Sequence, residues 1–266
     1  MDKASYPVQR TVKYSFTVKN PSSDPVESAQ LQVIAPIEIG PFQESLSLNA
    51  SQPFEIKRDG SGAKQMTFAI DNLPPYGSRN ISVVVSVGLS AQGQPIDSVR
   101  SEDFLNDEKL VQLTDPDIQR IAKRLKTKDR RETITKTYDW IVANVRNTGY
   151  VRDDLGAVQA LKRKSGDCTE FMYLFTALAR ANGIPTRNIA GFVAKENRIL
   201  RPADYHNWNE VYLDGSWHLV DTDREVLMGK SSEYIAMRLI SESRSSRSVN
   251  SQNFFSSSQN IQVTMN

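Results

Sequence analysis

Strict alternation of apolar and polar side chains is the feature that most limits how the N-terminal part of this chain can fold. From Arg10 to Lys19 apolar residues occupy alternate positions, which predicts a strand with one buried face. The alternation returns further along, and turn-forming residues separate the runs. The later runs are Leu31–Val33, Met66–Ile70 and Ile81–Leu89, and the turns are Asn20-Pro21, Asp24-Pro25, Asp59-Gly60 and Pro74-Pro75. Short strands joined by turns predict a β-sandwich of immunoglobulin-like type over residues 1–92.

The pattern changes in the middle of the chain. Residues 93–108 have no sustained period and several turn formers, so they predict a linker. In the following domain, 109–266, the apolar spacing becomes helical, and Thr114 or Asp115 can cap a first helix that has Pro116 in its first turn. Two more helices are predicted over 129–146 and 168–182, and strands over 187–194, 206–213 and 216–221. The predicted fold class is therefore α+β.

Composition excludes several classes of function. Lys and Arg number 33 and Asp and Glu 31, so the net charge of +2 provides no field that would hold nucleic acid. One cysteine excludes a disulfide framework, and neither the two histidines nor the acidic residues have zinc or calcium spacing. No apolar run reaches the roughly 18 residues of a membrane span, and the first residues lack the apolar region of a secretory signal. We expect no metal, no cofactor, no nucleic-acid partner and no membrane insertion; composition does not indicate an oligomeric state.

The single cysteine, Cys168, stands where a helical pattern begins. The preceding Ser165-Gly166-Asp167 is a turn, and the apolar helical spacing starts at Phe171. A helix N-terminus stabilises a thiolate, which is the nucleophilic form, and its free N–H groups can hold an oxyanion. The alternative is a small buried side chain, which is a common use of a free cysteine. Position alone leaves both alternatives open.

A predicted hairpin supplies a base and an acid. Asp214-Gly215 between two β-rich runs predicts a two-residue loop. In that register Trp208 lies opposite Asp221 and His206 opposite Asp223, all on one face. Diagonal neighbours on a sheet face lie within about 7–8 Å at their α-carbons, so the diagonal Asp221 can also reach the imidazole. The register therefore does not decide whether Asp221 or Asp223 bonds to His206.

His218 is the competing base. It alternates with Trp217 and Leu219 and points to the face opposite Asp221, so we interpret it as structural. His206 taken singly would be interpreted as a packed or surface histidine. Its combination with Cys168 and a hairpin acid favours a Cys, His, Asp arrangement.

Four motifs in order now carry a resemblance to a known family. They are Gly166-Asp167-Cys168, Gly183-Ile184-Pro185-Thr186-Arg187, His206-x-Trp208-x-Glu210 and Trp217-x-x-x-Asp221. Over roughly Trp140 to Asp221 the chain resembles the core of the transglutaminase-like superfamily. The resemblance implies a papain-like catalytic core with Cys168 as nucleophile, His206 as base and Asp221, rather than Asp223, as the orienting acid.

The resemblance also implies further site residues. An oxyanion-hole donor is expected upstream of the cysteine, and Trp140 and Tyr150 are the candidates. Trp208 is expected to form a wall of the cleft, and Glu210 to orient the sheet. The charged loop Lys195–Tyr205, just before the histidine, could act as a lid over the cleft.

The function expected from these residues is hydrolysis of a peptide or isopeptide bond through a thioester acyl-enzyme. The first alternative is a transglutaminase or other acyltransferase, which passes the acyl group to an amine. The second is a binding or assembly protein that keeps the fold without turnover. We expect a protein or peptide substrate, and an exported bacterial protein in the periplasm or outside the cell.

Overall fold

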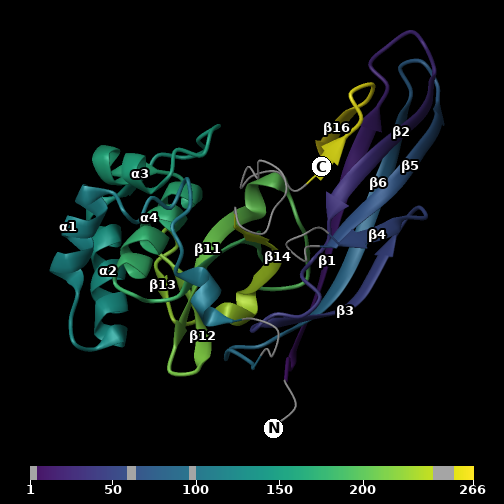
Figure 1. Cartoon of the computed structure of the whole chain (residues 1–266). Helices are drawn as coiled ribbons and strands as arrows, with labels where there is room; N and C mark the ends of the chain where they lie inside the picture. Colours follow the sequence, from purple (N-terminus) through teal and green to yellow (C-terminus); the bar gives the residue numbers. More distant parts are fainter. Residues whose placement is uncertain (1–4, 59–63, 96–99, 242–254) are drawn as a thin grey trace.

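The structure of the protein, a computed structural model, describes residues 5–58, 64–95, 100–241 and 255–266. Its N-terminal part is built from two sheets whose inner faces share one apolar core (Figure 1). One sheet contains β1 (Val8–Lys19), β6 (Ser78–Leu89) and β3 (Gln43–Ala50), and the other contains β2 (Val26–Ile34), β5 (Lys64–Leu73) and β4 (Glu55–Arg58). The β-rich N-terminal part predicted from alternation is confirmed.

Alternation in β1 buries one face of that strand. Tyr14 and Phe16 are almost fully enclosed, and they share the core with Leu31 of β2 and Phe68 of β5. Alternation does not predict β3 and β4, because they carry few buried residues; all four residues of β4 are exposed. An edge strand of this kind has no buried face to leave a pattern in the sequence.

In the second part, the described residues form four α-helices beside a five-stranded sheet in the order β13-β12-β11-β9-β14. The helices are α1 (Pro116–Leu125), α2 (Arg130–Asn144), α3 (Ala157–Arg163) and α4 (Cys168–Ala181). The strands of the sheet are β9 (Thr186–Val193), β11 (Tyr205–Leu213), β12 (Ser216–Asp221), β13 (Val226–Leu227) and β14 (Tyr234–Ile240). Helix α4 lies between the other helices and the sheet (Figure 1). The predicted α+β fold class is confirmed.

Helix termini follow the capping residues in the sequence. The carboxylate of Asp115 accepts the N–H groups of Asp117 and Ile118 and so begins α1. Gly183, at φ +74°, ends α4 in the left-handed conformation that glycine adopts at no steric cost. Helix α3 is not predicted, since its seven residues are too few to show a helical period. Within the described ranges no helix has the length and apolar character needed to cross a membrane.

The predicted hairpin forms with the predicted loop. Asp214 and Gly215 both have positive φ, and the strands pair from Leu213 with Ser216 to Asn209 with Val220. Strand β12 then ends at Asp221, and residues 222–225 turn back towards β13. The turn takes Asp223 out of the ladder position opposite the histidine that the ideal register would give it.

The C-terminal strands differ from the sequence prediction. Strand β15 (Phe255–Ser257) pairs with β2, and β16 (Gln262–Met265) pairs with β1, so both extend the N-terminal sheets. The sequence prediction assigned these residues to the catalytic domain over 109–266, whereas both strands pair with strands of the sandwich. The alternation of these residues predicts strands, but strand pairing over more than two hundred residues leaves no local signal.

The loop before the histidine also differs from its prediction. Its strand β10 (Arg198–Ile199) pairs with β1, and the N–H of Leu200 donates to the carbonyl of Lys13 at 2.7 Å. The N–H of Thr11 donates to the Asn197 side chain at 2.8 Å. These bonds anchor the loop along the edge of the sandwich, which is the opposite of a free lid.

The two parts of the chain share apolar packing. Leu200, Phe192 from β9, and Ile235 and Met237 from β14 belong to the same core as the inner faces of the sandwich. In the predicted linker, the 3₁₀ helix η1 (Ser101–Phe104) brings the Phe104 ring edge-on to Trp217, with centroids 5.5 Å apart. The sandwich is thus packed against the sheet that carries the site.

Candidate active site

Cys168 is the first residue of α4 and is partly exposed. The preceding Asp167 caps the helix: its carboxylate accepts the N–H of Thr169 at 2.8 Å, while the Glu170 carboxylate accepts the N–H of Asp167 at 3.2 Å. This reciprocal pair is a capping box. It holds the thiol at the end of the helix where the dipole favours an anion.

Gly166 makes room for the capping box. A Cβ at this position would lie 2.3 Å from the Cβ of Glu170, which is closer than any real contact. The glycine of the Gly-Asp-Cys motif is therefore explained by packing against the buried glutamate.

The same two carboxylates hold a neighbouring loop. The N–H of Val151 donates to Asp167 at 2.8 Å, and the N–H of Leu155 donates to Glu170 at 2.9 Å. Glu170 is fully buried, and burial raises its pKa to about 7. The sequence prediction did not include Glu170, although the Asp-x-x-Glu spacing is typical of a capping box.

A short parallel ladder lies directly before the cysteine. Strand β7 (Arg146–Asn147) follows α2 and pairs with β8 (Ser165–Gly166), directly before the cysteine. From the end of β7, the Asn147 amide donates to Asp223 at 2.6 Å. Asp223 thus bonds to this ladder and not to the histidine.

His206 and Asp221 lie in direct contact. His206 Nε2 is 2.7 Å from Asp221 Oδ2, and both residues are buried. Asp221 also accepts the O–H of Tyr234 on Oδ2 at 2.8 Å and the N–H of Arg224 on Oδ1 at 3.0 Å. Of the two acids that register leaves open, Asp221 is the one that bonds to the imidazole.

The histidine is strongly basic in this environment. Burial lowers the pKa of His206, but hydrogen bonds with Asp221 and Cys168 raise it by more, to about 10. With Nε2 bonded to the carboxylate, Nδ1 is the ring nitrogen that remains for the cysteine. His206 therefore contacts Asp221 and is close enough to Cys168 for the thiol to act on its pKa.

The oxyanion and cleft candidates are scattered. Trp140 packs partly buried against the helical core, and Tyr150 is 77% exposed in the loop beside Val151. Trp208 is 2% exposed, and its indole N–H is enclosed without a hydrogen-bond partner among the described residues. The expectation that Trp208 forms a cleft wall is not met, because the ring lies inside an apolar cluster with Tyr234.

The other conspicuous residues of the hairpin are structural in their contacts. Glu210 forms a buried ion pair with Arg187, whose guanidinium lies 4.3 Å from the centre of the Trp217 ring. His218 Nε2 bonds to Ser216 at 3.0 Å. None of these contacts involves the cysteine, in agreement with the interpretation of His218 as structural.

Two asparagines that the sequence analysis did not single out join the strand to the helix. Asn207 donates to Thr169 Oγ1 at 2.9 Å, and Asn209 donates to Thr176 Oγ1 at 2.8 Å. They alternate with His206 along β11, so one face of the strand bonds to α4 and the other carries the histidine. These buried bonds set the position of α4, and with it the cysteine, relative to the histidine.

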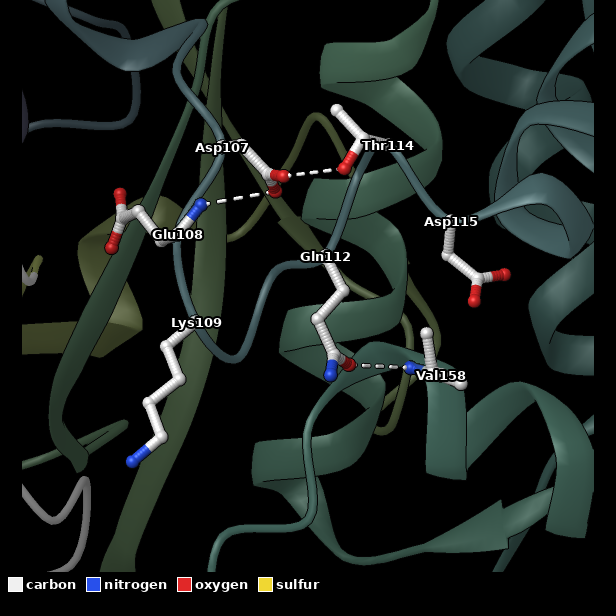
Figure 2. A pocket seen from close by; sticks show the side chains of 7 residues that line it. All are labelled: Asp107, Glu108, Lys109, Gln112, Thr114, Asp115 and Val158. Atoms are coloured by element: carbon white, nitrogen blue, oxygen red, sulfur yellow. Dashed lines mark hydrogen bonds between the residues drawn. The ribbon is translucent and has the colours of Figure 1, made fainter.

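An open pocket of about 570 Å³ lies elsewhere in the structure, and Cys168, His206 and Asp221 are not among the residues that line it. Figure 2 shows that its polar groups bond to one another: Asp107 accepts the Thr114 hydroxyl and the N–H of Glu108, and Gln112 accepts the N–H of Val158. The pocket is therefore bordered by bonds that hold the chain together. Across the described ranges no group of acidic, His or Cys side chains could hold a metal ion.

Comparisons with known proteins found one family model and several solved structures that are similar to this chain. Residues 119–222, which include the cysteine, the histidine and the acid, match the transglutaminase-like superfamily. The fold resembles that of a "Putative Cysteine Protease" from Cytophaga hutchinsonii, with 20% identity, a TM-score of 0.64, and 97% of this chain and 90% of that chain covered. It also matches the periplasmic domain of TgpA from Pseudomonas aeruginosa, with 15% identity, a TM-score of 0.42, and 80% and 90% covered. No curated protein matches the sequence.

Proposed function

We propose that this protein is a cysteine-dependent hydrolase of peptide or isopeptide bonds. The proposal starts from the match of residues 119–222 to the transglutaminase-like superfamily. Cys168 is the nucleophile, His206 the base and Asp221 the acid that orients the base. The substrate is a protein or peptide. An exported location is part of the same proposal and rests on association with the architecture alone.

One observation carries the proposal. A half-buried cysteine at a helix N-terminus raises the pKa of a neighbouring histidine whose Nε2 is 2.7 Å from a buried carboxylate. The raised pKa of His206 favours an imidazolium, and the imidazolium in turn favours a thiolate. A cysteine that only filled a core would need neither partner.

The reaction begins with transfer of the thiol proton from Cys168 to His206. The thiolate attacks the amide carbonyl, forming a carbon–sulfur bond and an oxyanion. The imidazolium returns its proton to the departing nitrogen as the carbon–nitrogen bond breaks, which leaves a thioester and a free amine. His206 then takes a proton from water, and attack by the resulting hydroxide releases the acid and the thiol.

The first turn of α4 contains a candidate N–H donor for the oxyanion. The Asp167 carboxylate already accepts the N–H groups of Thr169 and Glu170. In the described residues we find no acceptor for the N–H of Cys168, which makes it the candidate donor. The capping box therefore holds the turn rigid while one donor stays available.

Transfer to an amine would use the same first half of the reaction, so the acceptor must be tested directly. We would incubate the protein with casein and a fluorescent primary amine, then follow both new amino termini and incorporated label. The Cys168→Ala variant is the control for both signals. New termini without label support hydrolysis, and incorporated label supports transfer.

The covalent step can be tested without a substrate. Iodoacetamide should alkylate Cys168 rapidly at neutral pH, and Asp221→Asn should slow the reaction. Slow alkylation of the wild type, at the rate of an ordinary buried thiol, would reject the enzyme and favour a binding or assembly protein.

A further inference from the structure

Tyr234 contacts the candidate site from a strand that none of the four sequence motifs includes. It begins β14, and its O–H donates to Asp221 Oδ2 at 2.8 Å. This is the same oxygen that bonds to His206 Nε2 at 2.7 Å. Two donors from different strands therefore converge on one carboxylate oxygen.

The surroundings hold the phenol in this direction. Tyr234 is 3% exposed, and its ring meets the Trp208 ring edge-on, with centroids 5.1 Å apart. A Cβ at Gly191 would come within 2.8 Å of that indole, so the glycine leaves the space in which Trp208 packs. The rest of this cluster is mostly apolar, including Phe104 and Leu219. A hydroxyl placed there would be costly without an acceptor, and Asp221 is the acceptor.

The carboxylate is held at both oxygens. Oδ1 accepts the N–H of Arg224 at 3.0 Å, and Oδ2 accepts the tyrosine and the histidine. Rotation of the carboxylate away from the imidazole would break the other two bonds. The Tyr234 hydrogen bond also stabilises the negative charge of Asp221 and so weakens its effect on the imidazole.

We propose that Tyr234 is a fourth member of this site, a positioning residue that holds Asp221 against His206 and moderates the basicity of the imidazole. The inference rests on the proposed function for its catalytic meaning. A moderated base matters for the proposed reaction, because an imidazolium that held its proton too tightly would protonate the leaving nitrogen slowly.

The other ionisable groups around the pair are compatible with this role. Burial and the nearby Asp221 raise the pKa of Tyr234 well above its usual value, so the phenol stays a donor at physiological pH. Asp223 and Cys168 act on the histidine, and Tyr138 of α2 lies near Asp221. The test must therefore change the tyrosine hydroxyl alone.

The experiment measures the pKa of His206 directly by NMR of protein labelled at histidine. The chain has two histidines, so His218→Gln assigns the signals. Working in a Cys168→Ala background removes the thiol and makes the result independent of catalysis. Tyr234→Phe should raise the pKa of His206 by about half a unit to one unit, because the carboxylate loses one hydrogen bond while the N–H of Arg224 still holds it beside the imidazole.

Tyr212→Phe is the matched control, since this tyrosine packs against the same cluster and has no contact with Asp221. It should leave the pKa of His206 unchanged. 3,5-Difluorotyrosine at position 234 is a stronger donor of nearly the same shape and should lower that pKa. No shift in either Tyr234 variant, or an equal shift in the control, would overturn the inference.

A second readout separates this inference from the proposed function. In protein that retains Cys168, Tyr234→Phe should move the alkaline transition in the pH profile of iodoacetamide alkylation to higher pH. Slow alkylation of the wild type at every pH would reject the proposed enzyme. The NMR shift would still report whether Tyr234 acts on the pair.

Discussion

Leu200 provides a test of how the site-bearing sheet is joined to the sandwich. Its side chain is fully enclosed in the sandwich core, whereas the preceding Ile199 is 62% exposed. Both residues lie in the loop that β10 anchors on β1, shortly before His206. Leu200→Ala should therefore destabilise the whole chain, and Ile199→Ala should have little effect.

The size of the effect follows from the burial. Replacing leucine by alanine removes three carbons, and each buried methylene contributes about 0.8 kcal/mol, so the transfer effect is about 2.4 kcal/mol. The cavity left in a closely packed core adds to this, which gives about 3 kcal/mol for Leu200→Ala. For the exposed Ile199→Ala we expect a change within about 0.5 kcal/mol.

Urea unfolding followed by tryptophan fluorescence and circular dichroism measures both changes. The shared core predicts one cooperative transition in the wild type, seen at the same urea concentration by both probes. Leu200→Ala should shift its midpoint without changing the slope. A loss below about 1 kcal/mol, equal losses in the two variants, or a separate early transition of the sandwich would refute the packing described above.

Three further predictions concern the site itself. Gly166→Ala should slow iodoacetamide alkylation of Cys168, because the new Cβ would displace Glu170 and loosen the helix cap; an unchanged rate would contradict the packing explanation for the glycine. Asp221→Asn should lower the pKa of His206 by more than one unit and slow alkylation at neutral pH at least tenfold, as measured by NMR titration and mass spectrometry. The folded-state pKa of His206 is raised from 6.5 to about 10, so the protonated histidine stabilises the fold fully below pH 6.5 and loses this effect as the pH rises to 10. Between these pH values, the free energy of unfolding should fall more steeply for the wild type than for Asp221→Asn.

Local sequence signals were sufficient for much of the candidate site. The turn before Cys168, the helix that starts at it and the Asp214-Gly215 loop all depend on neighbouring residues, so each could be predicted without tertiary contacts. Hairpin register then brought His206 within reach of two acids. The family resemblance, and not the register, favoured Asp221.

The sequence by itself thus determined the β-rich and helical halves, the helix end that carries the cysteine, and the hairpin that carries the histidine. Tertiary structure decided the rest: the turn after Asp221 removed Asp223 from the histidine, and β14 brought Tyr234 to the carboxylate. It also placed the last strand, β16, on β1. These features rest on contacts between strands far apart in the chain, and such pairing depends on the whole fold and leaves no pattern within any one segment.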